Sequence, residues 1–380
     1  MINYPPLSES SLRHLSSCAP SKIAVWFPEM SDCFLATYIH HLDPFAIQFT
    51  ESVGLRWYGL AYVSGFISAF FLLRWFVKLK GSELRDSEVA DFVTIISLFG
   101  IMLGGRLGYM LFYNFGELIA NPASFFDVLG GGMSSHGGIL GTVLVALIYA
   151  RIKKKSWTGL GDNLVIVCSL GVFFGRIANF VNGELYGRKT DSNLAMKFPS
   201  EIIEGSRSPE GYFSWNFPTN QLVEVASKAK DIAPELLDQV NDTVANATAS
   251  GFDPHYAVSQ LILKASQENE KFRVLLGDIL TPRHPSQLYE ALIEGLLLFL
   301  ILLAIRLKWK NLYHGVITGI FFLLYAVGRI FVENYREPDA ELIAGMTRGQ
   351  FYSTFMIVIG IGFLIFGFLR KRRNEIPASA

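Results

Sequence analysis

Long apolar stretches, separated by short polar segments, run through most of the chain. A helix that crosses the roughly 30 Å hydrocarbon core of a bilayer needs about 20 predominantly apolar residues. Seven stretches approach or exceed that length: 53–77, 89–113, 133–150, 162–181, 286–305, 315–332 and 350–369. The pattern predicts an all-α polytopic membrane protein with about seven transmembrane helices.

One long polar segment interrupts this pattern between the fourth and fifth apolar stretches. It is rich in charged and hydroxyl side chains and contains helix-like stretches such as 234–244. We therefore expect five parts: an N-terminal arm (1–52), transmembrane helices one to four (53–186), a head (187–283), transmembrane helices five to seven (284–370) and a tail (371–380).

The lysine and arginine residues indicate how the helices cross the membrane. They cluster after alternate apolar stretches, within 78–85, 151–155, 306–310 and 370–373. The short loop 114–132 on the opposite side contains Glu117 and Asp127 but no lysine or arginine. Cytoplasmic loops of membrane proteins carry the excess of basic residues. The C-terminus is therefore predicted to be cytoplasmic, with the N-terminal arm and the head outside.

The composition agrees with this topology and excludes some functions. Apolar residues make up 51% of the chain and charged residues 17%, below the roughly 25% that is usual in soluble domains. The formal net charge is zero, which removes any argument for nucleic acid as a partner. Histidine and cysteine show no metal-ligand spacing, so we expect no metal or other cofactor. Cys18 and Cys33 could form a disulfide if the arm faces an oxidising compartment, and a free pair is about equally expected.

Three arginines fall inside predicted transmembrane helices: Arg106, Arg176 and Arg329. Each costs about 2.5–3.5 kcal/mol at the bilayer centre. Their helices run outward in the predicted topology, which brings all three toward the outer half of the membrane. One interpretation is structural ion pairs, because Glu333 lies four residues after Arg329 and Glu184 follows the helix of Arg176. Few other carboxylates match them in the sequence. The other interpretation is therefore an anionic ligand, since the guanidinium fork suits phosphate oxygens.

His136 is predicted to lie at the same level, in the first turn of the third helix. The positive end of the helix and partial burial both favour a neutral imidazole, which can accept a proton. The alternative is a packing histidine with no chemical role. Tyr58 reaches this level from the first helix, although tyrosines are also common as anchors at membrane interfaces.

The second predicted helix carries a row of small residues, Gly100, Gly104 and Gly108. Glycines spaced four apart share one helical face and allow another helix to approach closely. Arg106 lies beside this row, so an alternative role for it is to hold helices together.

The polar motifs together resemble one known family. In chain order they are 56–62 (RWYGLAY), 104–114 (GGRLGYMLFYN), 131–138 (GGMSSHGG), 175–187 (GRIANFVNGELYG), 283–290 (RHPSQLYE) and 325–339 (YAVGRIFVENYREPD). This ordered set is similar to that of the prolipoprotein diacylglyceryl transferases, bacterial cytoplasmic-membrane enzymes with seven transmembrane helices. The family pattern usually has Phe directly before the histidine, where this chain has Ser135.

The resemblance implies an activity and a set of site residues. The family transfers a diacylglyceryl group from phosphatidylglycerol to the lipobox cysteine of a prolipoprotein signal peptide, forming a thioether and releasing glycerol phosphate. By resemblance, Arg176 and Arg329 bind the phosphate, and His136 matches a histidine often proposed as the base. The other positions that the resemblance assigns to phospholipid binding are Tyr58, Asn179, Glu184, Gly187, Tyr325 and Glu333.

Two other classes of function remain open from the residues alone. An anion or lipid transporter also places arginines within the membrane, but transporters usually show internal repeats and sites near the midplane. This sequence shows no fixed-period repeat, and its polar residues are biased outward. A structural membrane scaffold would leave the intramembrane arginines unexplained. We therefore favour the enzyme.

The topology predicts which residues a membrane-impermeant thiol reagent reaches. In a background without native cysteines, a cysteine at Ser208 in the head should be labelled from outside the cell. A cysteine at Ser379 in the tail should be labelled only after the membrane is opened. The reverse labelling pattern would contradict the predicted orientation.

Overall fold

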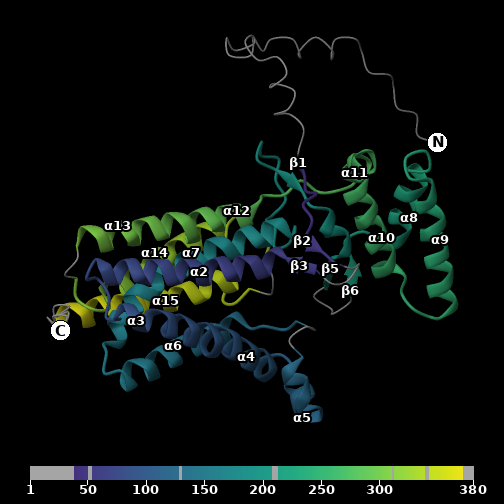
Figure 1. The fold of residues 1–380 in the computed structure, drawn as a ribbon. Helices are drawn as coiled ribbons and strands as arrows, with labels where there is room; N and C mark the ends of the chain where they lie inside the picture. The colour runs from purple at the N-terminus through teal and green to yellow at the C-terminus, as the bar shows by residue number, and fades with distance from the viewer. Residues whose placement is uncertain are drawn as a thin grey trace, which may run out of the picture.

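The computed structural model describes residues 38–49, 54–127, 131–207, 213–309, 312–338 and 342–370. These residues form a bundle of long apolar helices with a smaller helical head at one end (Figure 1). The carboxyl end of the last helix, α15 (Arg348–Arg370), lies at the other end of the bundle (Figure 1). Cys18 and Cys33, whose pairing the sequence left open, lie outside the described residues.

Each of the seven predicted apolar stretches forms a helix. The helices are α2 (Trp57–Lys78), α3 (Asp86–Ile95) continued by η2 (Ile96–Leu103) and α4 (Gly104–Phe112), α6 (Ser135–Ile152), α7 (Trp157–Val181), α12 (Ser286–Glu290) continued by η5 (Ala291–Leu297) and α13 (Leu298–Lys308), α14 (Val316–Val332) and α15 (Arg348–Arg370). Within the described residues, six are long and apolar enough to cross a membrane. The apolar α14 is shorter, with 17 residues, which at 1.5 Å per residue span about 25 Å. The predicted polytopic all-α architecture is confirmed.

The first membrane helix begins later than its apolar pattern suggests. The stretch was expected from residue 53, whereas α2 begins at Trp57. The preceding residues form β3 (Gly54–Arg56), which pairs antiparallel with β2 (Phe45–Gln48). Hydropathy depends on the residues and not on their conformation, so it could not distinguish a strand from a first helical turn at this position.

The glycine row of the second membrane helix contacts α6 through backbone atoms. Gly104 and Gly108 lie against Gly137, and Gly100 and Gly104 lie against Gly141. A Cβ atom at Gly137 would collide with the backbone of the facing helix. The predicted close helix contact is therefore confirmed, and its partner also presents glycines four residues apart. Between these two helices the chain forms α5 (Phe115–Ala120) and η3 (Pro122–Phe126).

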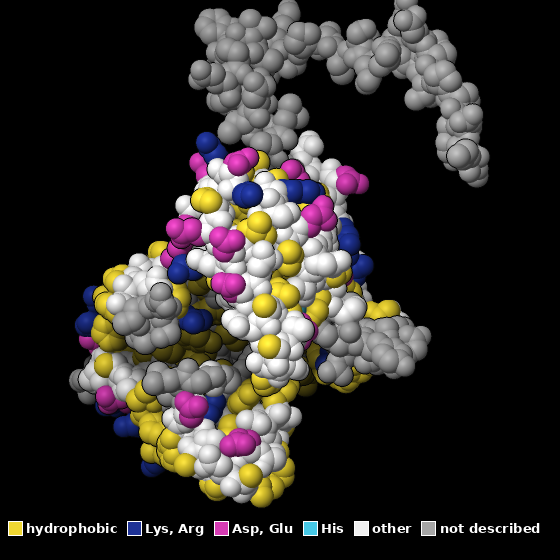
Figure 2. All heavy atoms as spheres, turned by 90° about the vertical axis from the view of Figure 1, so that its right-hand side faces the viewer, with side chains coloured by type: hydrophobic (Ala, Val, Ile, Leu, Met, Phe, Trp, Pro, Cys, Tyr) yellow, Lys and Arg dark blue, Asp and Glu magenta, His cyan; other side chains and the backbone are white. Residues whose placement is uncertain are grey.

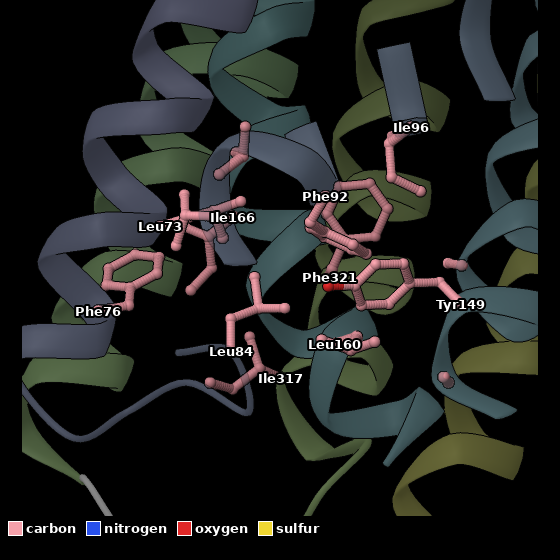
Figure 3. Close-up of a cluster of buried hydrophobic side chains, with 14 of the residues drawn as sticks. Leu73, Phe76, Leu84, Phe92, Ile96, Tyr149, Leu160, Ile166, Ile317 and Phe321 are labelled. Atoms are coloured by element: carbon pink, nitrogen blue, oxygen red, sulfur yellow. The ribbon is translucent and has the colours of Figure 1, made fainter. Parts of the chain in front are cut away.

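An apolar cluster joins the membrane helices toward the end opposite the head. Figure 3 shows its side chains from α2, α3, α6, α7 and α14 packed together. Next to this cluster the carboxylate of Asp162 on α7 is buried and accepts hydrogen bonds from the start of α14. The donors are Gly315 N at 2.8 Å, Thr318 N at 2.8 Å and Thr318 Oγ1 at 2.7 Å. These bonds satisfy backbone N–H groups that a helix start leaves without partners, and they fix α14 against α7.

The head has a hydrophobic core of its own. It consists mainly of α8 (Thr219–Lys228), α9 (Pro234–Ala249), α10 (His255–Glu268), α11 (Glu270–Gly277) and η4 (Pro199–Ile203), with short strands β4 (Met196–Lys197), β5 (Gly205–Arg207) and β6 (Phe213–Trp215). The predicted helix at 234–244 is confirmed as part of α9. The end of the N-terminal arm joins the head, because β1 (Tyr38–Ile39) pairs in parallel with β4.

The glycine contact predicts a stability difference between two substitutions. Gly137→Ala should lower thermal stability in detergent by about 1–3 kcal/mol, because the added methyl group overpacks the contact between α4 and α6. Gly171→Ala is a matched control within a membrane helix, since a Cβ there meets no atom within 4 Å. Equal unfolding temperatures for the two variants would contradict this account of the contact.

Candidate active site

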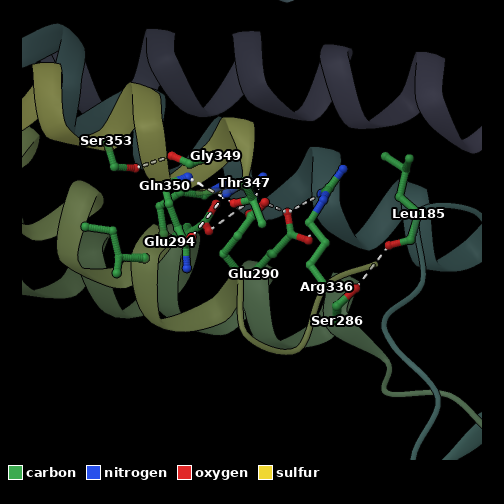
Figure 4. A network of polar contacts seen from close by, with 12 residues as sticks. Leu185, Ser286, Glu290, Glu294, Arg336, Thr347, Gly349, Gln350 and Ser353 are labelled. Atoms are coloured by element: carbon green, nitrogen blue, oxygen red, sulfur yellow. Dashed lines mark hydrogen bonds and ion pairs between the residues drawn. The ribbon is translucent and has the colours of Figure 1, made fainter. Parts of the chain in front are cut away.

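Two of the predicted site arginines meet at one carboxylate. Arg176 on α7 places Nη2 2.8 Å from Oε2 of Glu290, and Arg329 on α14 places Nη1 3.1 Å from the same oxygen. Glu290 ends α12, and its side chain is fully buried. Figure 4 shows this carboxylate within a network of polar contacts.

A third arginine reaches the other oxygen of this carboxylate. Arg336, in the segment after α14, places Nη1 3.0 Å from Oε1 of Glu290. Its side chain is only 6% exposed. Arg336 belongs to the last recognised motif, but no spacing along the chain indicates that it lies near Arg176.

Two more carboxylates complete the group. Glu333 Oε2 lies 3.0 Å from Arg329 Nη2, as the spacing of these two residues predicted. Glu294, on η5, is fully buried and more weakly engaged, with Oε1 3.5 Å from Arg329 Nη1 and Oε2 3.9 Å from Arg176 Nη2. The arginine cluster, as we name it, thus comprises Arg176, Arg329, Arg336, Glu290, Glu294 and Glu333, with three charges of each sign.

This balance corrects one expectation from the sequence. Arg106, Arg176 and Arg329 were expected to have few matching carboxylates, but Arg176 and Arg329 each contact at least one. The missed signal is a polar row in the fifth membrane helix, formed by Gln287, Glu290 and Glu294. Their spacing of three and four residues places them on one helical face, and all three are buried.

The two expected phosphate-binding arginines differ in how many of their guanidinium nitrogens contact a carboxylate. Arg329 is 14% exposed and has both Nη1 and Nη2 bound to carboxylates. Arg176 is 21% exposed, and only its Nη2 contacts a carboxylate. Within the described part of the chain, Nε and Nη1 of Arg176 have no hydrogen-bonding partner. Of the two, Arg176 therefore keeps N–H groups that an anion can use.

Three further predicted residues form a hydrogen-bonded group beside Arg176. Tyr58 Oη donates to Glu184 Oε1 at 2.5 Å, and Asn179 Nδ2 donates to the same oxygen at 2.9 Å and to the Tyr58 hydroxyl. Gln287 Nε2 donates to the Glu184 carbonyl oxygen at 2.7 Å. This group ties the start of α2 to the end of α7 and to α12. Glu184 therefore does not pair with Arg176, which was the alternative in the sequence.

Tyr325 and Gly187 have separate surroundings. Tyr325 lies one turn before Arg329 on α14, and its hydroxyl interacts with Glu294. Gly187 donates its N–H to the His284 carbonyl oxygen at 2.8 Å. A Cβ at Gly187 would collide with the carbonyl oxygen of Tyr335. A close approach of two chain segments thus explains why glycine occupies position 187.

Arg106 does not join the arginine cluster. It is 7% exposed and donates to the carbonyl oxygens of Ser124, Phe125, Gly131 and Gly132. These bonds hold the segment between α4 and α6. The structural interpretation therefore accounts for Arg106.

His136 stands on a different helix from the arginines. It occupies the first turn of α6, as predicted, where Ser134 caps the helix by accepting from Gly137 N at 3.2 Å. Its side chain is exposed, and its ring lies 6.1 Å from that of Tyr352 on α15. Among the described residues, no hydrogen bond or ion pair joins His136 to Arg176 or Arg329.

Seen from the end that carries the head, the surface between the head and the membrane helices is hollowed, with hydrophobic and basic side chains around the hollow (Figure 2).

A second ionic group connects the arginine cluster to the head. Arg283 Nε donates to Glu201 Oε1 at 2.9 Å, and its Nη1 donates to Glu337 Oε2 at 3.1 Å. The guanidinium also lies over the ring of Tyr186, whose hydroxyl donates to Glu204. Burial raises the pKa of both the Tyr186 hydroxyl and the Glu204 carboxyl above their ordinary values.

Comparison with known proteins connects this geometry to one family. The family profile described as prolipoprotein diacylglyceryl transferase matches residues 44–366. Proteins of Bdellovibrio bacteriovorus, Idiomarina loihiensis and Shigella boydii, each named phosphatidylglycerol–prolipoprotein diacylglyceryl transferase, are 37%, 33% and 34% identical to this chain. The alignments cover 89%, 88% and 90% of this chain and 96%, 95% and 99% of the relatives. Because the profile and the relatives both extend over most of its length, the chain belongs to the prolipoprotein diacylglyceryl transferase family.

Proposed function

We propose that this protein transfers the diacylglyceryl group of phosphatidylglycerol to the lipobox cysteine of prolipoproteins. The products are a thioether-linked lipid on the cysteine and free glycerol phosphate. The observation that carries the proposal is the partly exposed guanidinium of Arg176, held by a buried carboxylate with Nε and Nη1 still available. These N–H groups can donate charge-assisted hydrogen bonds to the oxygens of a phosphodiester.

The reaction forms one bond and breaks one bond. The cysteine sulfur attacks the glycerol carbon that bears the phosphate ester, so a carbon–sulfur bond forms as the carbon–oxygen bond breaks. The thiolate is the reactive form, and His136 takes the thiol proton as general base. The leaving glycerol phosphate gains negative charge as it departs. Arg176 stabilises that charge directly, in a site where the low dielectric strengthens the interaction.

The other predicted residues hold in place the helices that form this site. Arg329 anchors α14 to the carboxylates, and the Tyr58, Asn179 and Glu184 group fixes the end of the helix that carries Arg176. Gly187 allows the segment after that helix to pass close to Tyr335. In this proposal they shape the phospholipid site, and Arg176 binds its phosphate.

We place the protein in the bacterial cytoplasmic membrane with the head and arm outside. The pairing of β1 with β4 supports a common side for the arm and the head. The carboxyl end of α15 lies at the opposite end of the bundle (Figure 1), which agrees with the basic residues that follow alternate helices. The substrates fit this placement, since signal peptides and phospholipid headgroups meet at the outer surface.

Thioether formation tests the function directly. The purified protein in phosphatidylglycerol vesicles should convert a lipobox peptide to its diacylglyceryl form and release glycerol phosphate in equal amount, measured by mass spectrometry. A peptide with serine in place of the lipobox cysteine is the control. Movement of intact lipid across the vesicle without any peptide product would contradict the proposal.

Arg176→Lys should separate charge from geometry. Lysine keeps the positive charge but loses the planar set of N–H donors, so transfer should fall by about a hundredfold while the protein still folds. Arg329→Lys is the comparison, because both Nη atoms of Arg329 bind carboxylates; its loss should include lower thermal stability. Near-normal transfer by Arg176→Lys would assign Arg176 a structural role.

His136→Gln should separate base catalysis from lipid orientation. A general base contributes about 10²- to 10⁴-fold, so transfer should fall in that range while phosphatidylglycerol binding stays close to normal. Part of the loss should return as pH rises toward the thiol pKa of about 8.5, because more thiolate then forms without a base. His41→Gln, another exposed histidine, is the control. Weaker lipid binding with no recovery at high pH would show that His136 orients the headgroup.

A further inference from the structure

Glu290 is the most highly engaged carboxylate of the arginine cluster. Its two oxygens contact guanidiniums from three separate segments: Arg176 at 2.8 Å, Arg329 at 3.1 Å and Arg336 at 3.0 Å. The side chain is fully buried. Replacing Glu290 with a neutral residue would remove the carboxylate that these three arginines share.

We infer that Glu290 is a positioning residue for phosphate recognition, which acts by holding Arg176 in the conformation that binds the phospholipid. The inference rests on the proposed function. Glu290 binds Nη2 of Arg176, so the N–H groups of Nε and Nη1 are left as separate donors for phosphate oxygens. Arginine has many rotamers, and fixing one costs entropy at the moment of binding unless the protein has already fixed it. The ion pair fixes it during folding.

Arg336 and Arg329 hold Glu290 in turn. Arg336 binds Oε1, while Arg329 shares Oε2 with Arg176. The carboxylate therefore cannot rotate without breaking a contact to another buried guanidinium. This arrangement gives Arg176 a fixed counter-ion and not merely a nearby negative charge.

A purely electrostatic role makes the opposite prediction. If Glu290 only lowered the positive potential near Arg176, its removal would strengthen the binding of an anionic phospholipid. If it positions Arg176, its removal weakens that binding although the site becomes more positive. The direction of the change in phosphatidylglycerol affinity thus separates the two roles.

The same helix provides a matched comparison. Glu294 lies four residues after Glu290, is equally buried and faces the same two helices. Its distances to Arg176 and Arg329 are longer, 3.9 and 3.5 Å, and no contact to Arg336 is recorded among the described residues. Glu294→Gln removes a carboxyl group from the same face of the same helix, with a smaller effect on the conformation of Arg176.

The experiment compares Glu290→Gln, Glu290→Asp and Glu294→Gln in the full-length protein. Each variant is purified in detergent, checked by thermal unfolding, and assayed for transfer in mixed micelles with phosphatidylglycerol and lipobox peptide varied separately. We expect Glu290→Gln to raise the KM for phosphatidylglycerol at least tenfold, with a much smaller change in the KM for the peptide. Glu290→Asp should recover part of the loss, and Glu294→Gln should show a smaller increase.

A double variant excludes simple charge imbalance. Glu290→Gln with Arg336→Gln removes one charge of each sign and restores the balance of the cluster. If Glu290 only neutralises Arg336, this variant recovers the normal KM for phosphatidylglycerol, which overturns the inference. We expect the KM to stay raised, because Arg176 still lacks its partner. Should Glu290→Gln fail to fold, the charge-balanced double variant takes its place and is judged by the same KM.

Equilibrium binding keeps the inference separate from the proposed function. Fluorescent phosphatidylglycerol is titrated into each purified variant without peptide, so that no transfer is needed. Weaker binding by Glu290→Gln supports the positioning role, and unchanged or tighter binding overturns it. If the unaltered protein binds this lipid but forms no thioether, the proposed function fails while the result for Glu290 stands.

Discussion

A guanidinium group inside a membrane is stable only where acceptors surround it, because water is absent and the cost of an isolated charge is high. Glu290 meets this requirement for Arg176, Arg329 and Arg336 together. These arginines belong to α7, α14 and the segment that follows α14, so one carboxylate fixes three parts of the chain relative to α12. Breaking a buried pair by removing one partner typically costs about 3–5 kcal/mol. A shift of α14 by one turn would impose that penalty, and the register of these helices is therefore strongly specified.

The helix that carries His136 is held by another kind of contact. The pair formed by α4 and α6 meets through glycine backbones, with Gly104 and Gly108 against Gly137. Arg106 then secures the loop between them through carbonyl oxygens. The proposed base and the proposed phosphate ligands thus come from two helix groups with different packing chemistry. In the described part of the chain, the ring of His136 lies against the ring of Tyr352 on α15.

The sequence was sufficient to predict the membrane helices, because apolar length is set by bilayer thickness and needs no tertiary information. It also predicted the glycine contact and the pair of Arg329 and Glu333, since both depend on spacing within a helix. It did not predict that Glu290 and Glu294 face the arginines, which depends on how α12 and η5 rotate against α7. A polar row in an apolar helix was the available signal. The start of α2 was misplaced because hydropathy does not distinguish the strand β3 from a first helical turn.

The link between Arg176 and Glu290 has a consequence for how the chain is made. Arg176 lies before the head in the sequence and Glu290 lies after it. With the head on the outer side of the membrane, as we propose, the whole polar head must cross before the two charges can meet. Until then, Arg176 has entered the bilayer without its main counter-ion. The fifth helix then brings Glu290 and Glu294 to it, and Arg329 arrives with the following helix. Successive insertion steps are thus coupled by charge, and each new helix supplies the partner that the previous ones lack.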